Sequence, residues 1–415
     1  MRSSFPPELE IHPTRELHGS ITLPASKSSS TRAILAAALA EGRSYVVNLA
    51  PSNNVRALVD ALRVLGATIS GDHGTVIVDG IGRSKLQSGV TLNPGNSGIV
   101  LRLLLGITAV LDQVRFETSF TDSLGKRANI EMLHSLKKLG VTYEAHGDEG
   151  QLPILLNGGK IRGGETSISC RRSSQFLSGL LYLGGLLDQP LLIAVEDEIV
   201  AKSMVSTTVS VLKHAGIDVQ VDRTWRRFYM PGQQRYSPTT HRVGSDPAST
   251  AALLAVASMV DSDVLLTGFS EEELGDGAVL NHLREIGVSI ETLNESIRVR
   301  GGGTFRARDF DGSKAPDAVL ALASLAAFAD GTSRFYNIEH VRYKECDRIS
   351  DFRSELMKAG IKTNETRDSL IIHGSPHGVP GGSSIDSHFD HGVIMAMSAI
   401  ALSACLEMKI ISFRL

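Results

Sequence analysis

The sequence predicts an α/β protein made of six similar units, grouped as two domains of three units each. Three observations predict this class. A helix that ends at a glycine and leads into a short β-branched run recurs five times. An Ala/Leu-rich helix that opens on Ser, Asn or Asp recurs six times. Both elements return at intervals of about 73 residues, and a fixed period of this size indicates repeated supersecondary units.

The first recurring element is the helix that ends at a glycine. Its five copies end at Gly66, Gly140, Gly216, Gly287 and Gly360, at steps of 74, 76, 71 and 73 residues. Glycine readily adopts the left-handed conformation that ends a helix. The β-branched run after each glycine favours a strand, so every copy predicts a helix, a tight turn and a strand.

The second recurring element is an apolar helix with a polar start. Its six starts are marked by Ser28, Ser97, Ser174, Ser249, Asp317 and Asp390, at steps of 69, 77, 75, 68 and 73 residues. A helix that is apolar nearly all round is buried, and Ser or Asp at its start suits an N-cap. Helix N-termini attract anions, so six starts gathered in one cleft would make a site for phosphates and carboxylates.

The period also predicts the domain boundaries. One unit cannot bury its own helix, whereas three units give about 220 residues, an ordinary domain size. Residues 231–238, PGQQRYSP, have turn composition and separate the third unit from the fourth. We expect an N-terminal domain at residues 20–240 and a C-terminal domain at residues 1–19 and 241–415, whose last unit uses both chain ends.

Composition excludes several classes of protein. The 415 residues carry 42 Lys+Arg against 45 Asp+Glu, so no bulk charge attracts nucleic acid or an anionic membrane. The longest apolar stretch, 318–329, is well short of the ~20 residues that span a bilayer, and the N-terminus lacks a signal core. Three widely spaced cysteines suit neither a disulfide framework nor a zinc site. We expect a cytoplasmic protein.

Two segments combine a helix start with cations or glycines. PASKSSSTRAIL carries Lys27, Ser28 and Arg32, whose charges suit a phosphate or carboxylate. NPGNSGIVLR carries Asn96 and Gly98 and ends in an arginine, and its glycines permit close approach of a ligand to the backbone. Either start alone could be an ordinary cap, but the added cations favour anion binding.

Two further segments supply donors and acid/base groups. RRSSQFLSG carries Ser173, Ser174 and Gln175, neutral donors that suit an oxyanion. HVRYKECDRIS carries alternating charges, among them Lys344 and Glu345. Taken alone it could be a solvated loop, but its density of charged groups at the repeat phase of Asp317 favours a functional role.

These segments resemble the enolpyruvyl transferases, and within them the branch that acts on shikimate 3-phosphate. PASKSSSTR is similar to the family's P-G-D-K-S-x-S-x-R, GNSGIVLR to G-N-A-G-T-x-x-R, TDSLGKRANIEML to G-D-x-S-L-x-x-R-P, and KECDR to K-E-x-D-R. The correspondence covers residues 19–404. It implies two domains, each of three βαβαββ units around a pseudo-threefold axis, an inside-out α/β barrel.

The resemblance also implies a reaction and its residues. The enolpyruvyl group of phosphoenolpyruvate (PEP) passes to the 5-hydroxyl of shikimate 3-phosphate or a related ring compound, with no metal and no organic cofactor. The partners are small anions, and we expect a monomer. The implied residues are, for catalysis, Lys27, Asp317 and Glu345; for the ring substrate, Ser28, Arg32, Ser173, Ser174 and Lys344; and for PEP, Asn96, Gly98, Arg127, Gln175 and Arg348.

Several positions depart from the family pattern. Gly392 stands where an Arg clamps the PEP carboxylate, Ala201 and Met204 replace a phosphate-binding Ser and a ring-contacting Tyr, and His340 replaces an Asn. Part of both ligand shells is thus lost while the acid/base set remains. A PEP-independent lyase acting on a shikimate-like ring is therefore a second hypothesis. A UDP-sugar enolpyruvyl transferase and a non-catalytic binding protein are weaker ones.

Overall fold

The computed structural model describes residues 8–71, 74–269 and 277–412. The chain divides into two compact units: the N-unit, Ala25–Val243, and the C-unit, Met1–Pro24 with Gly244–Leu415. The chain first passes from the C-unit to the N-unit after residue 24, later than the expected residue 19. It does so because β2 (Glu16–Thr22) pairs over its whole length with β15 (Asp261–Thr267) of the C-unit. The second crossing follows residue 243, since β14 (Thr240–Arg242) still pairs with β3 (Glu41–Val47).

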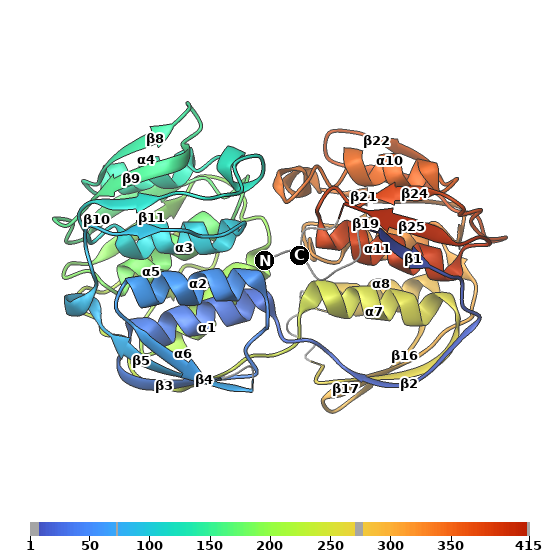
Figure 1. The fold of residues 1–415 in the computed structure, drawn as a ribbon, viewed down its shortest axis with the longest axis horizontal. Coiled ribbons are helices and arrows are strands. Elements are labelled where there is room, and N and C mark those ends of the chain that lie inside the picture. The colour runs from blue at the N-terminus through green and yellow to red at the C-terminus, as the bar shows by residue number, and fades with distance from the viewer. Residues whose placement is uncertain (1–7, 72–73, 270–276, 413–415) are drawn as a thin grey trace. The chain divides into compact units, whose positions relative to one another are not determined.

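The N-unit contains three four-stranded sheets of the same topology (Figure 1). In each sheet the first two strands are parallel and the other two join antiparallel. The sheets are β14-β3-β5-β4, with β4 (Thr68–Gly71) and β5 (Thr75–Ile81); β6-β7-β9-β8, with β6 (Thr91–Leu92), β7 (Val114–Phe116), β8 (Thr142–His146) and β9 (Gln151–Asn157); and β10-β11-β13-β12, with β10 (Gly164–Ile168), β11 (Leu191–Val195), β12 (Gln220–Val221) and β13 (Arg227–Met230).

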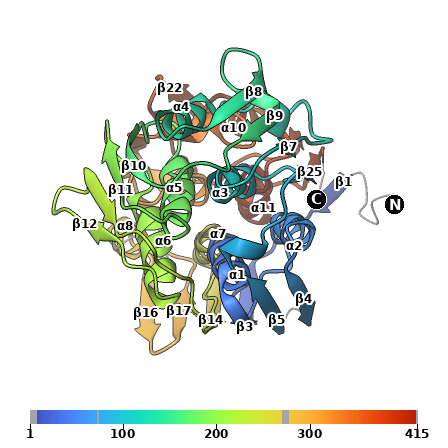
Figure 2. The ribbon, with the colours of Figure 1, turned by 90° about the vertical axis from the view of Figure 1, so that its left-hand side faces the viewer.

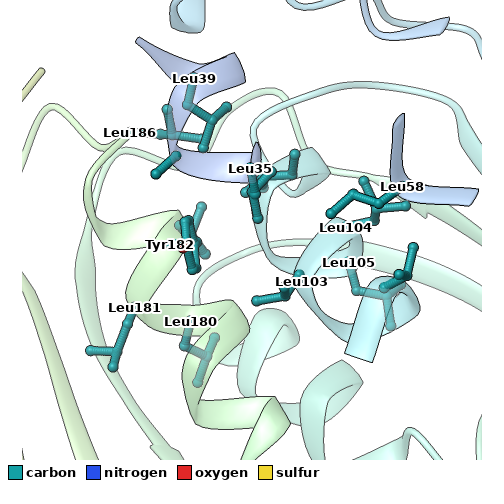
Figure 3. Packing of buried hydrophobic residues seen from close by; sticks show 14 of the residues in the cluster. Leu35, Leu39, Leu58, Leu103, Leu104, Leu105, Leu180, Leu181, Tyr182 and Leu186 are labelled. Atoms are coloured by element: carbon teal, nitrogen blue, oxygen red, sulfur yellow. The ribbon is translucent and has the colours of Figure 1, made fainter. Parts of the chain in front are cut away.

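Two helices accompany each sheet of the N-unit. They are α1 (Lys27–Leu39) and α2 (Asn53–Val64), α3 (Gly98–Thr108) and α4 (Ile130–Lys138), and α5 (Gln175–Gly184) and α6 (Lys202–His214), with 3-10 turns η1 (Arg83–Lys85) and η2 (Leu124–Lys126). The apolar helices α1, α3 and α5 lie inside and the sheets lie around them (Figure 2). Leucines of α1, α3 and α5 pack together in the core (Figure 3). The close approach of α3 and α5 requires glycine, since a Cβ on Gly106 would lie 2.1 Å from the carbonyl oxygen of Gly179.

The C-unit repeats this plan in two four-stranded sheets, whereas its third sheet has three strands among the described residues. Its sheets are β2-β15-β17-β16, with β16 (Ser289–Leu293) and β17 (Ser296–Arg300); β19-β21-β23-β22, with β19 (Phe310–Asp311), β21 (Thr332–Tyr336), β22 (Lys362–Glu365) and β23 (Leu370–His373); β1-β25-β24, with β1 (Glu8–Ile11), β24 (Ser384–Asp386) and β25 (Met408–Ile411); and the pair β18 (Phe305–Arg306) and β20 (Ala329–Asp330). Its helices are α7 (Pro247–Met259), α8 (Ala278–Ile286), α9 (Val319–Ala326), α10 (Ser350–Lys358) and α11 (His391–Ser403), with the 3-10 turn η4 (Glu339–Tyr343).

The predicted helix ends and starts can be compared with these elements. All five predicted cap glycines have positive φ, from +82° to +111°, so the glycine-ended helices are confirmed. The caps Ser97 and Asp390 also accept backbone N–H bonds as predicted. At α1 the cap is Ser26 instead of a residue from 27 onward, because its hydroxyl accepts from the Ser29 N–H at 3.1 Å. No helix in the described ranges has the length and hydropathy needed to span a bilayer.

Candidate functional site

The first cluster of the N-unit lies at the start of α1. The helix begins at Lys27, so Ser28 and Arg32 stand one turn apart on the same face. Arg32 is only 1% exposed, and its Nη1 donates to the Ser28 hydroxyl at 2.5 Å and to the Ser28 carbonyl at 3.0 Å. The half-buried Ser28 hydroxyl therefore faces a full positive charge at a helix N-terminus, an arrangement that suits an anionic ligand.

The guanidinium of Arg32 is held from α6 as well. Its Nε donates to the Thr208 hydroxyl at 2.7 Å, and that hydroxyl lies 2.9 Å from the Ser178 hydroxyl. Met204 of α6 brings its sulfur to 3.5 Å from the Ser28 hydroxyl. Thr208 could not be identified from the sequence. A threonine inside an amphipathic helix does not indicate which side chain will bond to its hydroxyl.

The second cluster joins α3 to α5. Arg102 is buried, and its Nη1 donates to Gln175 Oε1 at 2.7 Å and to the Ser173 hydroxyl at 3.2 Å. The guanidinium also lies over the Phe176 ring, 4.6 Å from its centroid. Ser174, 5% exposed, occupies the residue before α5. The structure thus brings Ser173 and Gln175 together through an arginine of the neighbouring helix.

Gly98 is the point where this cluster meets a second arginine. A Cβ on Gly98 would lie 3.1 Å from Arg127 Nη1, 3.3 Å from Arg102 Nη1 and 3.4 Å from Gln175 Oε1. Burial, and then the charge of Arg127, lower the pKa of Arg102 to about 9. The buried Arg127 Nη2 has no hydrogen-bond partner among the described residues. Two repelling guanidiniums at the N-terminus of α3 favour an anion between them.

Asn96 fixes the loop that carries Arg127. Its Oδ1 accepts from the Leu124 N–H at 3.2 Å, in the turn η2 directly before that arginine. The loop 95–98 and the loop 121–127 are therefore bonded to each other. All the PEP-type residues expected in the N-unit, Asn96, Gly98, Arg127 and Gln175, belong to this one cluster.

The two carboxylates that the sequence predicts as acid/base groups lie in the C-unit. Asp317, two residues before α9, has Oδ1 3.9 Å from Lys344 Nζ. Glu345 has Oε2 3.3 Å from Arg348 Nη2. Each carboxylate therefore lies beside one cation of the segment 344–348, and neither is fully exposed.

Among the described residues of this unit, Arg348 is the best-buried arginine or lysine. Its Nε and Nη2 donate to the two carboxylate oxygens of Asp390 at 2.8 and 2.9 Å, and both side chains are nearly or fully buried. Burial alone would lower the pKa of Arg348, but Asp390 and Glu345 outweigh it and raise the pKa. Burial alone would raise the pKa of Asp390, but Arg348 outweighs it and lowers the pKa. Sequence reasoning identified Asp390 as a cap but missed this pair.

Two histidines, His340 and His391, lie close to these charged groups. His340 is buried, its Nε2 has no partner within the described ranges, and burial, then Lys344, lower its pKa to about 4. Ligand atoms of Glu345, Asp390 and His391 lie within 4.8 Å of one another. Arg348 already pairs with both of these carboxylates, so its charge takes the place that a metal cation would need.

Comparisons with known proteins give the family. A family model described as EPSP synthase (3-phosphoshikimate 1-carboxyvinyltransferase) matches residues 11–413. The chain is 51% identical over 398 residues to a 3-phosphoshikimate 1-carboxyvinyltransferase of Burkholderia pseudomallei, covering 96% of this chain and 88% of the relative. It is 38% identical over 401 residues to the enzyme of that name from Deinococcus radiodurans, covering 96% and 90%.

Solved structures agree. An EPSP synthase from Acinetobacter baumannii superposes with a TM-score of 0.81 at 25% identity, covering 97% of this chain and 93% of that one. The enolpyruvyl transferase NikO from Streptomyces tendae gives 0.76 at 17% identity, covering 97% and 92%, and supports the fold alone. The fold is therefore the enolpyruvyl transferase fold, as the repeats and motifs predicted, and the chain belongs to the EPSP synthase family.

Proposed function

We propose that the chain transfers the enolpyruvyl group of PEP to the 5-hydroxyl of shikimate 3-phosphate. The observation that carries this proposal is the anion cluster at the start of α3, where Arg102, Arg127 and Gln175 surround Gly98. The relatives from Burkholderia pseudomallei and Deinococcus radiodurans are named for this reaction, which supports the assignment.

The reaction needs acid/base groups beside cations. C3 of PEP takes up a proton, the ring hydroxyl adds at C2 and loses its proton, and the tetrahedral intermediate then expels phosphate while C3 returns a proton. We assign the base near the hydroxyl to Asp317 and the proton donor or acceptor to Glu345, with Lys27 beside the reacting groups. The contacts of Asp317 with Lys344 and of Glu345 with Arg348 support this assignment, since a nearby cation stabilises each carboxylate in its ionised form.

We assign the remaining residues to the two anions. Ser28, Arg32, Ser173, Ser174 and Lys344 take the ring substrate, and Asn96, Gly98, Arg127, Gln175 and Arg348 take PEP. The bond from Arg32 to Ser28 and the bonds from Arg102 to Ser173 and Gln175 support this grouping. We further propose that the protein acts as a monomer in the cytoplasm, on these small anions and without nucleic acid or a membrane.

The lyase hypothesis rested on the depleted PEP shell. The comparisons give it no support, because the relatives named above are transferases. The test is incubation with shikimate, shikimate 3-phosphate and PEP in every combination, with products read by mass spectrometry. We expect a carboxyvinyl ether and inorganic phosphate only when shikimate 3-phosphate and PEP are both present. A ring product formed without PEP would refute the proposal and revive the lyase.

A further inference from the structure

The turn before α11 holds two consecutive non-glycine residues in the left-handed region. His388 has φ +50° and Phe389 has φ +56°. For residues other than glycine and asparagine this conformation costs free energy, so it persists only where the surrounding structure holds it. The next residue is Asp390, the partner of Arg348. The strain thus lies directly beside the most buried ion pair of the candidate site.

One buried carboxylate anchors this turn. Glu355 of α10 has a side chain only 1% exposed, and its Oε1 lies 2.9 Å from His388 Nε2 while its Oε2 accepts from the Asp386 N–H at 3.0 Å. Lys358 Nζ donates to both oxygens at 2.8 and 2.9 Å. Burial alone would raise the pKa of Glu355, but the bonds from Lys358 and His388 outweigh it and lower the pKa. Glu355 is therefore ionised, and it accepts hydrogen bonds from two residues of the turn, Asp386 and His388.

The anchored turn connects Glu355 of α10 with Arg348, which precedes the same helix. Arg348 lies just before α10, and Glu355 lies within that helix. Glu355 contacts His388, the chain leads from His388 through Phe389 to Asp390, and Asp390 accepts from Arg348 at 2.8 and 2.9 Å. Asp390 also accepts from the Gly392 N–H at 2.7 Å, which fixes the start of α11. Two of the three side-chain bonds of the Arg348 guanidinium thus go to a residue that directly follows the anchored turn.

We propose that His388 is a positioning residue, which through Glu355 and Asp390 aims the Arg348 guanidinium at the carboxylate of PEP. The proposal rests on the proposed function, because it assumes that Arg348 binds this anion. With Gly392 leaving the neighbouring position without a side chain, correct aim of Arg348 matters more. Loss of the bond from His388 should loosen Arg348 and so weaken PEP binding first, and it should affect Glu345 only through its single contact with Arg348.

Three substitutions separate positioning from simple stability. His388→Ala removes the bond to Glu355 and keeps the strained φ. His388→Gly removes the bond and relieves the strain, since glycine takes φ +50° freely. His388→Gln keeps an N–H that can reach Glu355. The matched control is His373→Ala, which removes a histidine of the same unit whose Nε2 lies 2.9 Å from Asn364 Oδ1, in the β22–β23 pair.

We expect KM for PEP to rise about 10- to 100-fold in His388→Ala and in His388→Gly, the effect of loosening one binding group. KM for shikimate 3-phosphate should stay unchanged, and turnover should fall much less than KM for PEP rises, the pattern expected when mainly binding is lost. His388→Gln should restore KM, and His373→Ala should not move it. In denaturant unfolding, His388→Gly should have a higher free energy of unfolding than His388→Ala. An unchanged KM in both variants, or a KM that follows stability so that the glycine variant is near normal, would overturn the proposal.

A readout without activity separates this proposal from the proposed function. In protein labelled with ¹⁵N-arginine, the buried Arg348 Nε–H should give a signal protected from exchange, assigned by its absence in Arg348→Lys. We expect His388→Ala and His388→Gly to shift or broaden it, and His373→Ala to leave it. If wild-type protein released no phosphate from PEP, the proposed function would fail. The proposal on Arg348 would then be judged by this signal alone, and an unmoved signal would refute it.

Discussion

Gly392 offers the sharpest test of how this protein holds PEP. A Cβ at this position would lie 3.1 Å from Asp390 Oδ1, 3.1 Å from Leu320 Cδ1 and 3.2 Å from Arg348 Nη2. These distances are tight, and two of the three atoms are locked in the buried ion pair. We therefore expect Gly392→Ala to lower the free energy of unfolding by about 1–3 kcal/mol, the usual cost of overpacking.

Gly392→Arg adds a guanidinium to the same Cβ. If its guanidinium reaches the PEP carboxylate, its charge-assisted hydrogen bonds are worth about 1.5–3 kcal/mol. At 1.4 kcal/mol per decade this corresponds to about 10- to 100-fold in affinity. The crowding at Cβ is common to both variants, so it cancels when Gly392→Arg is compared with Gly392→Ala. The expected result is a KM for PEP that is about 10- to 100-fold lower in the arginine variant than in the alanine variant.

The assay is phosphate release from PEP at saturating shikimate 3-phosphate, with PEP varied, for wild type and both variants. Denaturant unfolding of the same samples measures the cost of the Cβ separately. Equal KM values in the arginine and alanine variants would show that position 392 does not face the PEP carboxylate. Absence of release in wild type and both variants would instead contradict the proposed function.

Three further outcomes follow from the described contacts. Asp317→Asn and Glu345→Gln should each lower turnover by roughly 10²- to 10⁴-fold with little change in ring-substrate affinity, and near-normal turnover in either would contradict its assigned role. Asp390→Asn leaves Arg348 buried without its main partner and should cost about 3–5 kcal/mol of unfolding free energy at neutral pH. Because the folded-state pKa of Asp390 is lowered, its contribution is present above the unfolded pKa of about 3.9 and is lost as pH falls through the folded value, so the difference between wild type and variant should shrink below about pH 4. Thr208→Val keeps the shape of its side chain but removes the acceptor of Arg32 Nε at 2.7 Å, so it should lower unfolding free energy by about 1–3 kcal/mol, and an unchanged value would mean that water replaces the hydroxyl.

Periodicity was the part of the fold that sequence could predict. The glycine ends at Gly66, Gly140 and Gly216 depend on local backbone conformation alone, so their positions could be predicted residue by residue. The first crossing was expected at residue 19 and lies at residue 24, because the extent of β2 depends on its pairing with β15, far away in the sequence. Local chemistry predicts where helices end, and long-range pairing decides where strands end.

The same division applies to the candidate site. Hydrogen-bond donors at helix starts, such as the charged Lys27 and the neutral Gln175, could be recognised because helix N-termini attract anions wherever they occur. Their partners could not, since Thr208, Asp390 and Glu355 are identified only by the side chains that reach them in space. His388 lies beside a recognised motif, but nothing in the sequence indicates its left-handed backbone or its bond to Glu355.

β2 precedes the N-unit in the chain but belongs to the C-unit, whereas β14 is the last strand of the N-unit. This order has a consequence for synthesis on the ribosome. The N-unit, with β14 as its last strand, is one uninterrupted stretch of chain and can finish folding as soon as residue 243 has emerged. β2 is made before it, yet its partner β15 comes about 240 residues later. At about 5–20 residues per second, β2 waits roughly 10–50 s for that partner. Its sequence, ELHGSIT, is mostly polar, which keeps a strand that must wait with open edges from pairing with other chains.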